Sequence, residues 1–359
     1  MTKAPVNLNE FEAIARDKLP SMVFGYYVSG SDDQVTLRDN REAFNRIRLR
    51  PHYMRGVEQI DTSTTVLGHT MPYPFMVAPM GFMAMAHPDG ELAMARATAK
   101  HNIPMVLSTM SNYKIEEVAA ASEGLKFFQL YVYKNRAVTE ALVKRAENAG
   151  FKALVLTVDV PVLGRREADI HNGFHLPDGL IAGNLEGDEM KAINPAHAES
   201  GLSAYITELW ENNLSWEHLD WIKSVTDMPI LLKGILRGDD AQIALEHGAD
   251  GIIVSNHGGR QLDTAPAPID VLQEIVDAVD GRADVLMDGG IRRGTDIIKA
   301  LAVGAKAVLI GRPMMYALAY DGEAGVKQAL DLLTTEFETA MRLCGTRNLA
   351  EITPDLLMY

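Results

Sequence analysis

The stretch "DVLMDGGIRRGTDIIKALAVGAKAVLIGR", residues 284–312, has the pattern of a strand, a helix and a second strand. An apolar run from Asp284 ends in glycines and arginines, an amphipathic segment follows from Gly294 to Gly304, and another apolar run starts at Ala307. Apolar runs without polar alternation are typical of parallel strands that are covered on both faces. The stretch therefore predicts a βαβ unit.

The same alternation extends over most of the chain. Amphipathic segments such as Gly90 to His101, Arg136 to Gly150 and Gly238 to Gly248 separate short apolar runs. We predict eight buried strands, at residues 75–80, 105–109, 127–132, 153–160, 229–234, 251–256, 284–290 and 307–312. Eight repeats indicate an α/β fold, the (β/α)₈ TIM barrel. A doubly wound sheet would also alternate, but no G-x-G-x-x-G motif follows an early strand, which favours the barrel.

Two segments exceed what a barrel requires. Residues 1–74 precede the first strand and form an N-terminal extension with a predicted helix from Leu8 to Leu19. Strand starts lie roughly 22 to 33 residues apart, except for roughly 76 residues between the fourth and fifth strands. We assign the excess to an insertion at residues 161–214, on the face where barrel active sites lie, and expect an active-site lid. Residues 1–359 are predicted to form one barrel domain.

Charge and composition limit the classes of partner. The net charge of −14 opposes binding to nucleic acid, because the chain has no basic patch that would reverse this average field. The single cysteine, Cys344, excludes an intramolecular disulfide and a multi-cysteine metal site. The sequence shows neither a signal-peptide pattern nor an apolar run that is long enough to span a membrane. We expect a cytoplasmic protein without a nucleic-acid or membrane partner.

Polar residues and glycines gather where the predicted strands end. Because the carboxyl ends of barrel strands surround one active site, we expect these residues to act as a set. They are Met80, Gly81, Ser108, Gln129, Tyr131, Thr157, Asp159, Lys233, Ser255, Asn256, His257, Arg260, Asp288, Gly289, Gly290, Arg292, Gly311 and Arg312.

The ends of the last two strands have the composition of a phosphate site. "DGGIRRGTD" and "IGRP" combine glycines, which allow close backbone approach, with arginines, which form bidentate charge-assisted hydrogen bonds. The phosphate could belong to a substrate or to a cofactor. Lys233 follows four apolar residues into the barrel mouth, where a buried ammonium requires an anionic partner. The neutral side chains of Ser108, Gln129 and Thr157 suit the edge of a heterocycle.

His257 and Asp159 form the candidate catalytic pair. A carboxylate beside an imidazole fixes its tautomer and stabilises its protonated form, so His257 is the predicted base. Arg260 lies on the same loop, and Arg166 lies at the root of the insertion. Arginines around a histidine base indicate a site for a small carboxylate. We predict no metal site, because no second histidine has suitable spacing.

The motifs together resemble the FMN-dependent α-hydroxy-acid oxidases and dehydrogenases, the glycolate oxidase and L-lactate oxidase group. The resemblance covers nearly the whole chain in order. It rests on "YYVSGSDD" at 26, "MAHPDGE" at 85, "FFQLYVYK" at 127, "LTVDVPVLGRREADI" at 156, "LLKGI" at 231, "SNHGGRQLD" at 255, "DGGIRRGTDIIKAL" at 288 and "IGRPMMYALA" at 310.

The resemblance implies an FMN-bearing barrel, a tetramer or octamer, that oxidises an (S)-2-hydroxy acid to the 2-oxo acid. His257 resembles the active-site base and Asp159 its partner, while Tyr131 resembles the group that bonds the reacting hydroxyl. Arg260, Arg166 and Tyr26 resemble the clamp on the substrate carboxylate. The residues that resemble the FMN site are Lys233 near the flavin N1 and O2 edge, Asp288, Gly289, Gly290, Arg292, Gly311 and Arg312 toward the phosphate, and Pro79, Met80, Gly81, Ser108, Gln129, Thr157 and Ser255 along the flavin.

Three departures from the family pattern bear on the subtype. Gly81 stands where oxidases of this family usually have Ala, whereas the dehydrogenases and lactate monooxygenase usually have Gly. Met110 stands where plant glycolate oxidases have Trp, which leaves room for a larger apolar substrate group. Met80 replaces a residue that is often polar, although simple packing explains it equally well. We expect an oxidase that forms hydrogen peroxide from oxygen and prefers L-lactate to glycolate, with a dehydrogenase, a lactate 2-monooxygenase or a glycolate oxidase as alternatives.

Overall fold

The computed structural model describes residues 4–185 and 209–359, and its centre is a closed barrel of parallel strands. Neighbouring strands in the barrel follow chain order from β4 to β11, and β11 pairs with β4 to close it. The strands are β4 (Phe75–Val77), β5 (Met105–Leu107), β6 (Lys126–Leu130), β7 (Leu154–Thr157), β8 (Ile230–Ile235), β9 (Gly251–Val254), β10 (Asp284–Met287) and β11 (Ala307–Ile310). The predicted (β/α)₈ barrel is confirmed.

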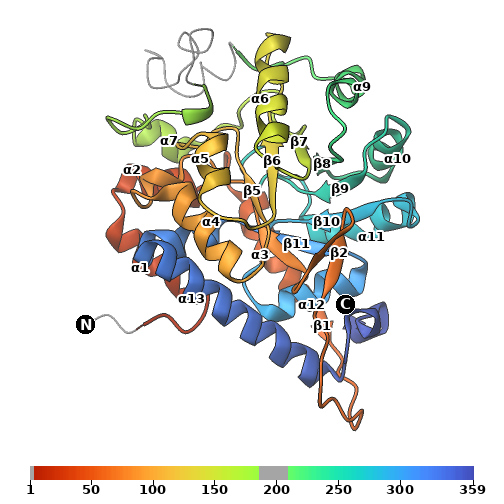
Figure 1. Ribbon diagram of the computed structural model, residues 1–359. Coiled ribbons are helices and arrows are strands. Elements are labelled where there is room, and N and C mark those ends of the chain that lie inside the picture. Colours follow the sequence, from red (N-terminus) through yellow and green to blue (C-terminus); the bar gives the residue numbers. More distant parts are fainter. Residues whose placement is uncertain (1–3, 186–208) are drawn as a thin grey trace.

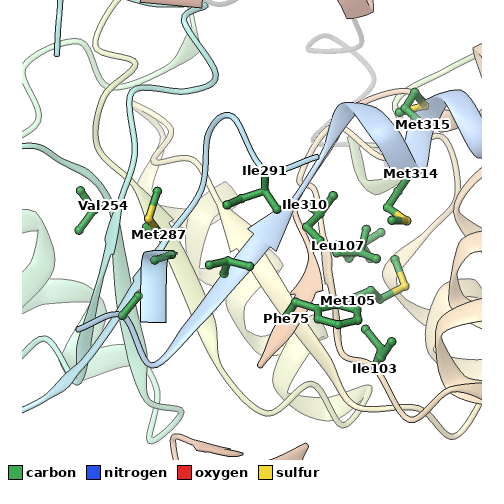
Figure 2. Packing of buried hydrophobic residues seen from close by; sticks show 14 of the residues in the cluster. Phe75, Ile103, Met105, Leu107, Val254, Met287, Ile291, Ile310, Met314 and Met315 are labelled. Atoms are coloured by element: carbon green, nitrogen blue, oxygen red, sulfur yellow. The ribbon is translucent and has the colours of Figure 1, made fainter. Parts of the chain in front are cut away.

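Alternate side chains of the strands enter two separate cores. Met76, Val106 and Leu231 belong to the cluster inside the barrel, while Phe75 and Leu107 belong to the cluster between strands and helices. Figure 2 shows part of this outer layer, including Met314 and Met315 at the start of the last helix. Burial on both faces explains why the strands lack polar alternation in the sequence.

A helix follows each barrel strand, and together these helices surround the barrel (Figure 1). Local signals start two of these helices. At α6 the Asn135 side chain accepts a hydrogen bond from the Ala137 N–H, and α11 has Pro268 in its first turn. The helices are α4 (Gly90–Lys100), α5 (Ile115–Ala120), α6 (Arg136–Asn148), α9 (Trp216–Val225), α10 (Gly238–Glu246), α11 (Pro268–Val279), α12 (Gly294–Val303) and α13 (Arg312–Cys344).

The N-terminal extension closes one end of the barrel and packs along its side. It contains α1 (Glu10–Lys18), α2 (Ser21–Val28), α3 (Val35–Arg46), β1 (Arg48–Leu49), β2 (Thr64–Val66) and β3 (His69–Met71). Val66 and Met71 of the β2–β3 hairpin complete the inner core, so the hairpin plugs the end of the barrel opposite the strand carboxyl ends. The α1 helix packs against α13 rather than directly on the strands (Figure 1).

Helix α13 is interrupted, and the extension compensates for the interruption. Asp321 and Gly322 have non-helical backbone angles, which frees carbonyl groups of the preceding turn. The Lys18 ammonium donates hydrogen bonds to the carbonyls of Ala319 and Tyr320, at 3.1 and 2.6 Å. At the C-terminus, β12 (Leu357–Met358) pairs with β1.

The structure describes only part of the insertion after β7, residues 161–185 and 209–214. This part includes α7 (Glu167–His171), the 3₁₀ turn η2 (Gly183–Leu185) and Trp210, which forms an isolated bridge with Tyr133. Residues 186–208 of the predicted lid lie outside the described residues, so the lid remains a prediction. Within residues 4–185 and 209–359, no helix combines the length and apolar character that crossing a membrane requires.

Candidate active site

One pocket at the carboxyl ends of the strands gathers nearly all the predicted site residues. It is an open pocket with about 1200 Å³ of empty space, solvent at its mouth included. The predicted residues that line it are Tyr26, Pro79, Met80, Gly81, Ser108, Met110, Gln129, Tyr131, Thr157, Arg166, Lys233, His257, Arg260, Asp288, Gly289, Gly290, Arg292, Gly311 and Arg312. The remaining three, Asp159, Ser255 and Asn256, lie behind this lining: Asp159 bonds His257, Ser255 bonds Lys233, and Asn256 bonds the Gly259 N–H.

His257 and Asp159 form a hydrogen-bonded pair across the pocket wall. The imidazole Nδ1 lies 2.8 Å from Asp159 Oδ1, so Nε2 is the ring nitrogen left for a substrate. Burial lowers the pKa of His257, and the Asp159 carboxylate only partly opposes this effect. Burial also disfavours ionisation of Asp159, but its interaction and hydrogen bond with His257 and the charge of Lys233 outweigh burial and lower the pKa of the carboxyl. A neutral imidazole held by an ionised carboxylate is the arrangement of a general base.

Lys233 is a buried cation with two fixed partners. Its ammonium donates to Ser255 Oγ at 2.8 Å and forms an ion pair with Asp288 Oδ2 at 3.1 Å. Burial acts to lower the pKa of Lys233, but the carboxylates of Asp288 and Asp159 outweigh it and raise the pKa. The pocket therefore contains a permanent positive charge at the end of β8.

Neutral side chains at the ends of β5, β6 and β7 form a connected row. Ser108 Oγ donates to Gln129 Oε1 at 3.2 Å, and Gln129 Nε2 donates to Thr157 Oγ1 at 3.1 Å. All three residues are buried and line the pocket. The row offers donors and acceptors in fixed positions, as the edge of a heterocycle requires.

Two arginines bring positive charge to the other end of the pocket. Arg166 is 6% exposed, and burial lowers its pKa to about 10. Among the described residues it forms no ion pair, and its one hydrogen bond is a weak 3.5 Å contact to the Arg260 carbonyl. Arg260 donates to the carbonyls of Tyr26 and Ser29 and lies over the Tyr26 ring, with its guanidinium carbon 4.9 Å from the centroid. The Asp169 carboxylate acts on Arg166 from a distance but forms no ion pair with it, so this buried guanidinium favours binding of an anion.

The loops after β10 and β11 form a cradle of backbone groups. Gly289 and Gly290 have φ of 90° and 82°, and a Cβ at Gly290 would lie only 1.9 Å from the Asn40 carbonyl oxygen. Only glycine satisfies both constraints. Arg292 lines the pocket, and Arg312 donates three hydrogen bonds to the carbonyls of Tyr27, Ser29 and Gly258. These bonds leave two of the five Arg312 N–H groups for a ligand.

Gly81 lies on a loop that is tied to the loop carrying Met110. The Phe82 N–H donates to the Met110 carbonyl at 2.9 Å, and Glu91 Oε1 accepts from the N–H groups of Met83 and Asn112, each at 3.1 Å. Burial raises the pKa of Glu91 to about 7. A Cβ at Gly81 would lie 3.3 Å from Met110 Cβ, so the space beside this glycine is small but not closed.

Sequence reasoning missed several residues of the wall, of which Trp210 is the most informative. Trp210 is 3% exposed, lines the pocket and stacks on Tyr131 with ring centroids 3.9 Å apart. It lies near the end of the insertion, which has no repeating pattern that would have placed it. The other missed lining residues are Tyr27, Ala78, Phe82, Val160, Leu163, Gly258, Ile291, Leu309, Ile310 and Met315.

The residues present fit FMN. Asp288 Oδ1 is buried and has no hydrogen-bond partner among the described residues, so it can accept a hydrogen bond from a hydroxyl of a ribityl chain. The glycine cradle with Arg292 and Arg312 can hold a phosphate, and the row from Ser108 to Thr157 can bond a flavin ring. No group of three or more His, Cys, Asp or Glu residues in the described ranges could hold a metal ion.

Comparisons of sequence with known proteins agree with this fit. The family model for FMN-dependent dehydrogenase matches residues 15–359. Glycolate oxidase 3 from Arabidopsis thaliana is 54% identical over 346 residues, which cover 96% of this chain and 94% of that protein. Glycolate oxidase from Spinacia oleracea is 52% identical over 346 residues, with coverage of 96% and 94%.

Solved structures resemble the whole barrel. A crystal structure of mandelate oxidase with (S)-4-hydroxymandelic acid has a TM-score of 0.93 and 41% identity, covering 99% of this chain and 98% of that one. A soluble mutant of the membrane-associated (S)-mandelate dehydrogenase from Pseudomonas putida has a TM-score of 0.92 and 37% identity, with 99% of both chains covered. The chain belongs to the FMN-dependent dehydrogenase family, and its cofactor is FMN.

Proposed function

We propose that the protein oxidises a small (S)-2-hydroxy acid to the 2-oxo acid, and that oxygen reoxidises the cofactor to give hydrogen peroxide. The observation that carries this proposal is Arg166, a buried guanidinium that forms no ion pair among the described residues, in the same pocket as the His257–Asp159 pair. A carboxylate ligand would neutralise this charge, and a base beside it could then act on the neighbouring carbon or hydroxyl.

Each side chain has a role in this reaction. Arg166, Arg260 and Tyr26 bind the carboxylate, and the Tyr131 phenol donates to the substrate hydroxyl. Burial raises the pKa of Tyr131, so the phenol keeps its proton as a donor. His257 takes up a proton from the substrate at Nε2, and Asp159 stabilises the imidazolium that forms.

The two electrons that the substrate loses require the cofactor and the charge beside it. Held by the glycine cradle, Arg292, Arg312 and the row from Ser108 to Thr157, FMN would supply the acceptor for the two substrate electrons and their route to oxygen. Lys233 supplies a fixed positive charge on the cofactor side of the pocket, held by Asp288 and Ser255 before any reaction begins. Because this charge is already in place, no reorganisation is needed when negative charge develops.

We propose L-lactate as the preferred substrate. Met110 is 5% exposed and lines the pocket, and its flexible thioether can pack against a methyl group or a longer apolar chain. Glycolate is the second candidate, because glycolate oxidases are 54% and 52% identical to this chain over almost their whole length. The ratio of kcat/KM for L-lactate and glycolate tests the choice, and a clear preference for glycolate would contradict it.

Gly81 leaves two alternatives to hydrogen peroxide formation. Family dehydrogenases and lactate monooxygenase usually have Gly at this position, where oxidases usually have Ala. We keep the oxidase as the proposal, with a dehydrogenase and a lactate 2-monooxygenase as alternatives. We further propose a cytoplasmic homo-oligomer, a tetramer or octamer, whose size sedimentation analysis would test.

Anaerobic reduction followed by admission of air tests the whole proposal. L-lactate is mixed with the FMN-loaded protein without oxygen, bleaching of the flavin is followed, and the products are analysed after air enters. We expect pyruvate and hydrogen peroxide. Acetate with carbon dioxide would indicate the monooxygenase, flavin that stays reduced would indicate the dehydrogenase, and flavin that no 2-hydroxy acid bleaches would contradict the proposal.

A further inference from the structure

A buried pair of amides joins the N-terminal extension to the loop that carries His257. Asn40 of α3 is 2% exposed, and Asn256 at the end of β9 is 4% exposed. Asn40 Nδ2 donates to Asn256 Oδ1 at 3.0 Å, and Asn256 Nδ2 donates to Asn40 Oδ1 at 2.7 Å. Two bonds in opposite directions fix both the position and the orientation of the Asn256 amide.

The Asn256 amide uses its full hydrogen-bonding capacity. Its Oδ1 also accepts from the Gly259 N–H at 3.0 Å, and its Nδ2 also donates to the Pro266 carbonyl at 3.1 Å. An amide side chain offers two donors and two acceptor sites, so Asn40 supplies half of the partners. Without the Asn40 side chain, one donor and one acceptor site of Asn256 would be buried without a partner.

The turn that Asn256 holds is an unusual one. His257, Gly258 and Gly259 have φ of 58°, 68° and 72°, so the chain stays in the left-handed region for three residues. Glycine adopts this region freely, but a histidine does so only where the surroundings impose it. Two side chains help to impose it here, because the Gly259 N–H donates to Asn256 Oδ1 and the His257 N–H donates to Ser255 Oγ at 3.1 Å. Bonds from the Gly259 N–H to the Asn256 carbonyl, from Arg312 to the Gly258 carbonyl and from the Ser31 N–H to the Gly259 carbonyl also hold the turn.

We propose that Asn40 is a positioning residue that acts through Asn256 to hold the turn presenting the His257 imidazole. The inference rests on the proposed role of His257 as the base. A separate set of contacts joins α3 to the phosphate cradle: the Asn40 carbonyl packs against Gly290, and the Arg41 side chain donates to the Gly290 carbonyl. The hydrogen bonds of the Asn40 side chain thus go to Asn256, but its Cγ would also lie 3.7 Å from a Cβ at Gly289, so FMN affinity is measured beside the reduction rate.

The test compares Asn40→Ala with a control on the same helix. Asn45→Ala removes an exposed amide whose described hydrogen bond goes to Glu42, at 3.2 Å. In FMN-loaded protein, we expect Asn40→Ala to lower the rate constant of anaerobic reduction by saturating L-lactate by roughly 10- to 100-fold, because small misplacements of a base are costly. We expect Asn45→Ala to leave it unchanged. The FMN dissociation constant should stay within about 3-fold of wild type in both variants. A tenfold increase, which corresponds to about 1.4 kcal/mol, would show that FMN binding is affected.

A double variant tests the path through Asn256. If Asn40 acts through Asn256, L-lactate should reduce the flavin of the double variant Asn40→Ala/Asn256→Ala no more slowly than that of Asn256→Ala alone. Additive losses would overturn the inference. So would an unchanged reduction rate in Asn40→Ala, or a raised FMN dissociation constant with a normal reduction rate at saturating FMN. Asn40→Ser serves as the milder change if alanine does not give folded protein, and the same outcomes apply.

Hydrogen exchange separates this inference from the proposed function. In Asn40→Ala, amides of peptides covering residues 255–261 should exchange faster than in wild type, while those covering residues 289–293 should not change. If exchange changes in this way but no 2-hydroxy acid reduces the flavin of the wild-type protein, the proposed function is contradicted. The coupling between Asn40 and the His257 turn would still stand. Unchanged exchange at residues 255–261 would overturn the coupling whatever the enzyme oxidises.

Discussion

The two ends of the pocket are built in different ways. At the cofactor end, side chains from neighbouring strands bond one another, as in the row Ser108, Gln129 and Thr157. At the substrate end, Tyr26 comes from α2 of the N-terminal extension and Arg166 from the start of the insertion. The barrel register thus fixes the row at the cofactor end, whereas segments added to the barrel supply Tyr26 and Arg166 at the substrate end. Tyr131, His257 and Arg260 still follow barrel strands.

This difference explains how one fold can serve several substrates. The strand ends cannot move without breaking the closed barrel, so the cofactor end keeps its geometry. The segments that carry Tyr26 and Arg166 attach to the barrel through loops and side chains, and their residues can change with little effect on the strands. Variants at the substrate end should therefore change catalysis or KM and leave FMN binding intact.

The largest effect is expected for His257→Gln. Loss of the base should lower the rate constant of anaerobic reduction by roughly 10²- to 10⁴-fold, the contribution of a positioned base. FMN affinity should stay unchanged, because the imidazole partner is Asp159 rather than a residue of the glycine cradle. Stopped-flow reduction and FMN titration measure the two quantities. Turnover close to wild type would show that His257 is not the base, and loss of FMN would show that the two ends are not separable.

Asp159→Asn should change both the rate and the pH profile. His257 acts as a base only when neutral, so kcat/KM should fall as pH drops through its pKa, which burial places below the ordinary value. The Asp159 carboxylate raises the pKa of His257, so its removal should move the acid limb of the profile to lower pH. The maximal rate should fall by roughly 10²-fold, because the imidazolium loses its partner. An acid limb that moves to higher pH would contradict this pairing.

Arg166→Met tests the substrate end through binding. Loss of a charge-assisted hydrogen bond of about 1.5–3 kcal/mol should raise KM for L-lactate by roughly 10- to 100-fold. Arg166 and Arg260 are neighbouring like charges, so removing Arg166 should not harm folding. The melting temperature serves as the control. Arg165→Met is the matched variant, because Arg165 is exposed and pairs with Glu167 at 3.6 Å. An equal effect of both variants would show that the local field, rather than a direct contact, attracts the acid.

The sequence predicted the cofactor end more completely than the substrate end. Each barrel strand begins within a residue of its predicted run, because burial on both faces leaves a clear apolar signal. The positions of residues at strand ends then follow from the topology alone. Arg166 could be placed only roughly, by its position at the root of the insertion, and Tyr26 had to be taken from the family resemblance, since no periodic pattern relates α2 to the barrel.

Some features depend on contacts that no local pattern encodes. The β2–β3 hairpin fills the barrel end with Val66 and Met71, but its short strands look like loop sequence. The Asn40–Asn256 pair joins residues 216 positions apart, and each amide alone is typical of a helix or a turn. The interruption of α13 falls at Asp321 and Gly322, an Asp-Gly pair that is a turn signal and that the sequence analysis did not use.

The smallest effect is expected for Trp210, which joins the insertion to the substrate end. Its ring stacks on Tyr131, and its backbone bridges Tyr133, so it restrains the phenol that is proposed to bond the substrate hydroxyl. Aromatic pairs contribute about 0.5–1.5 kcal/mol beyond burial, so Trp210→Leu should lower kcat/KM for L-lactate by roughly 2- to 10-fold. Trp210→Phe retains a stacking ring and should lose less. Equal losses in the two variants would mean that Trp210 acts by filling space rather than by stacking, and the substrate end would then depend on the insertion only for its shape.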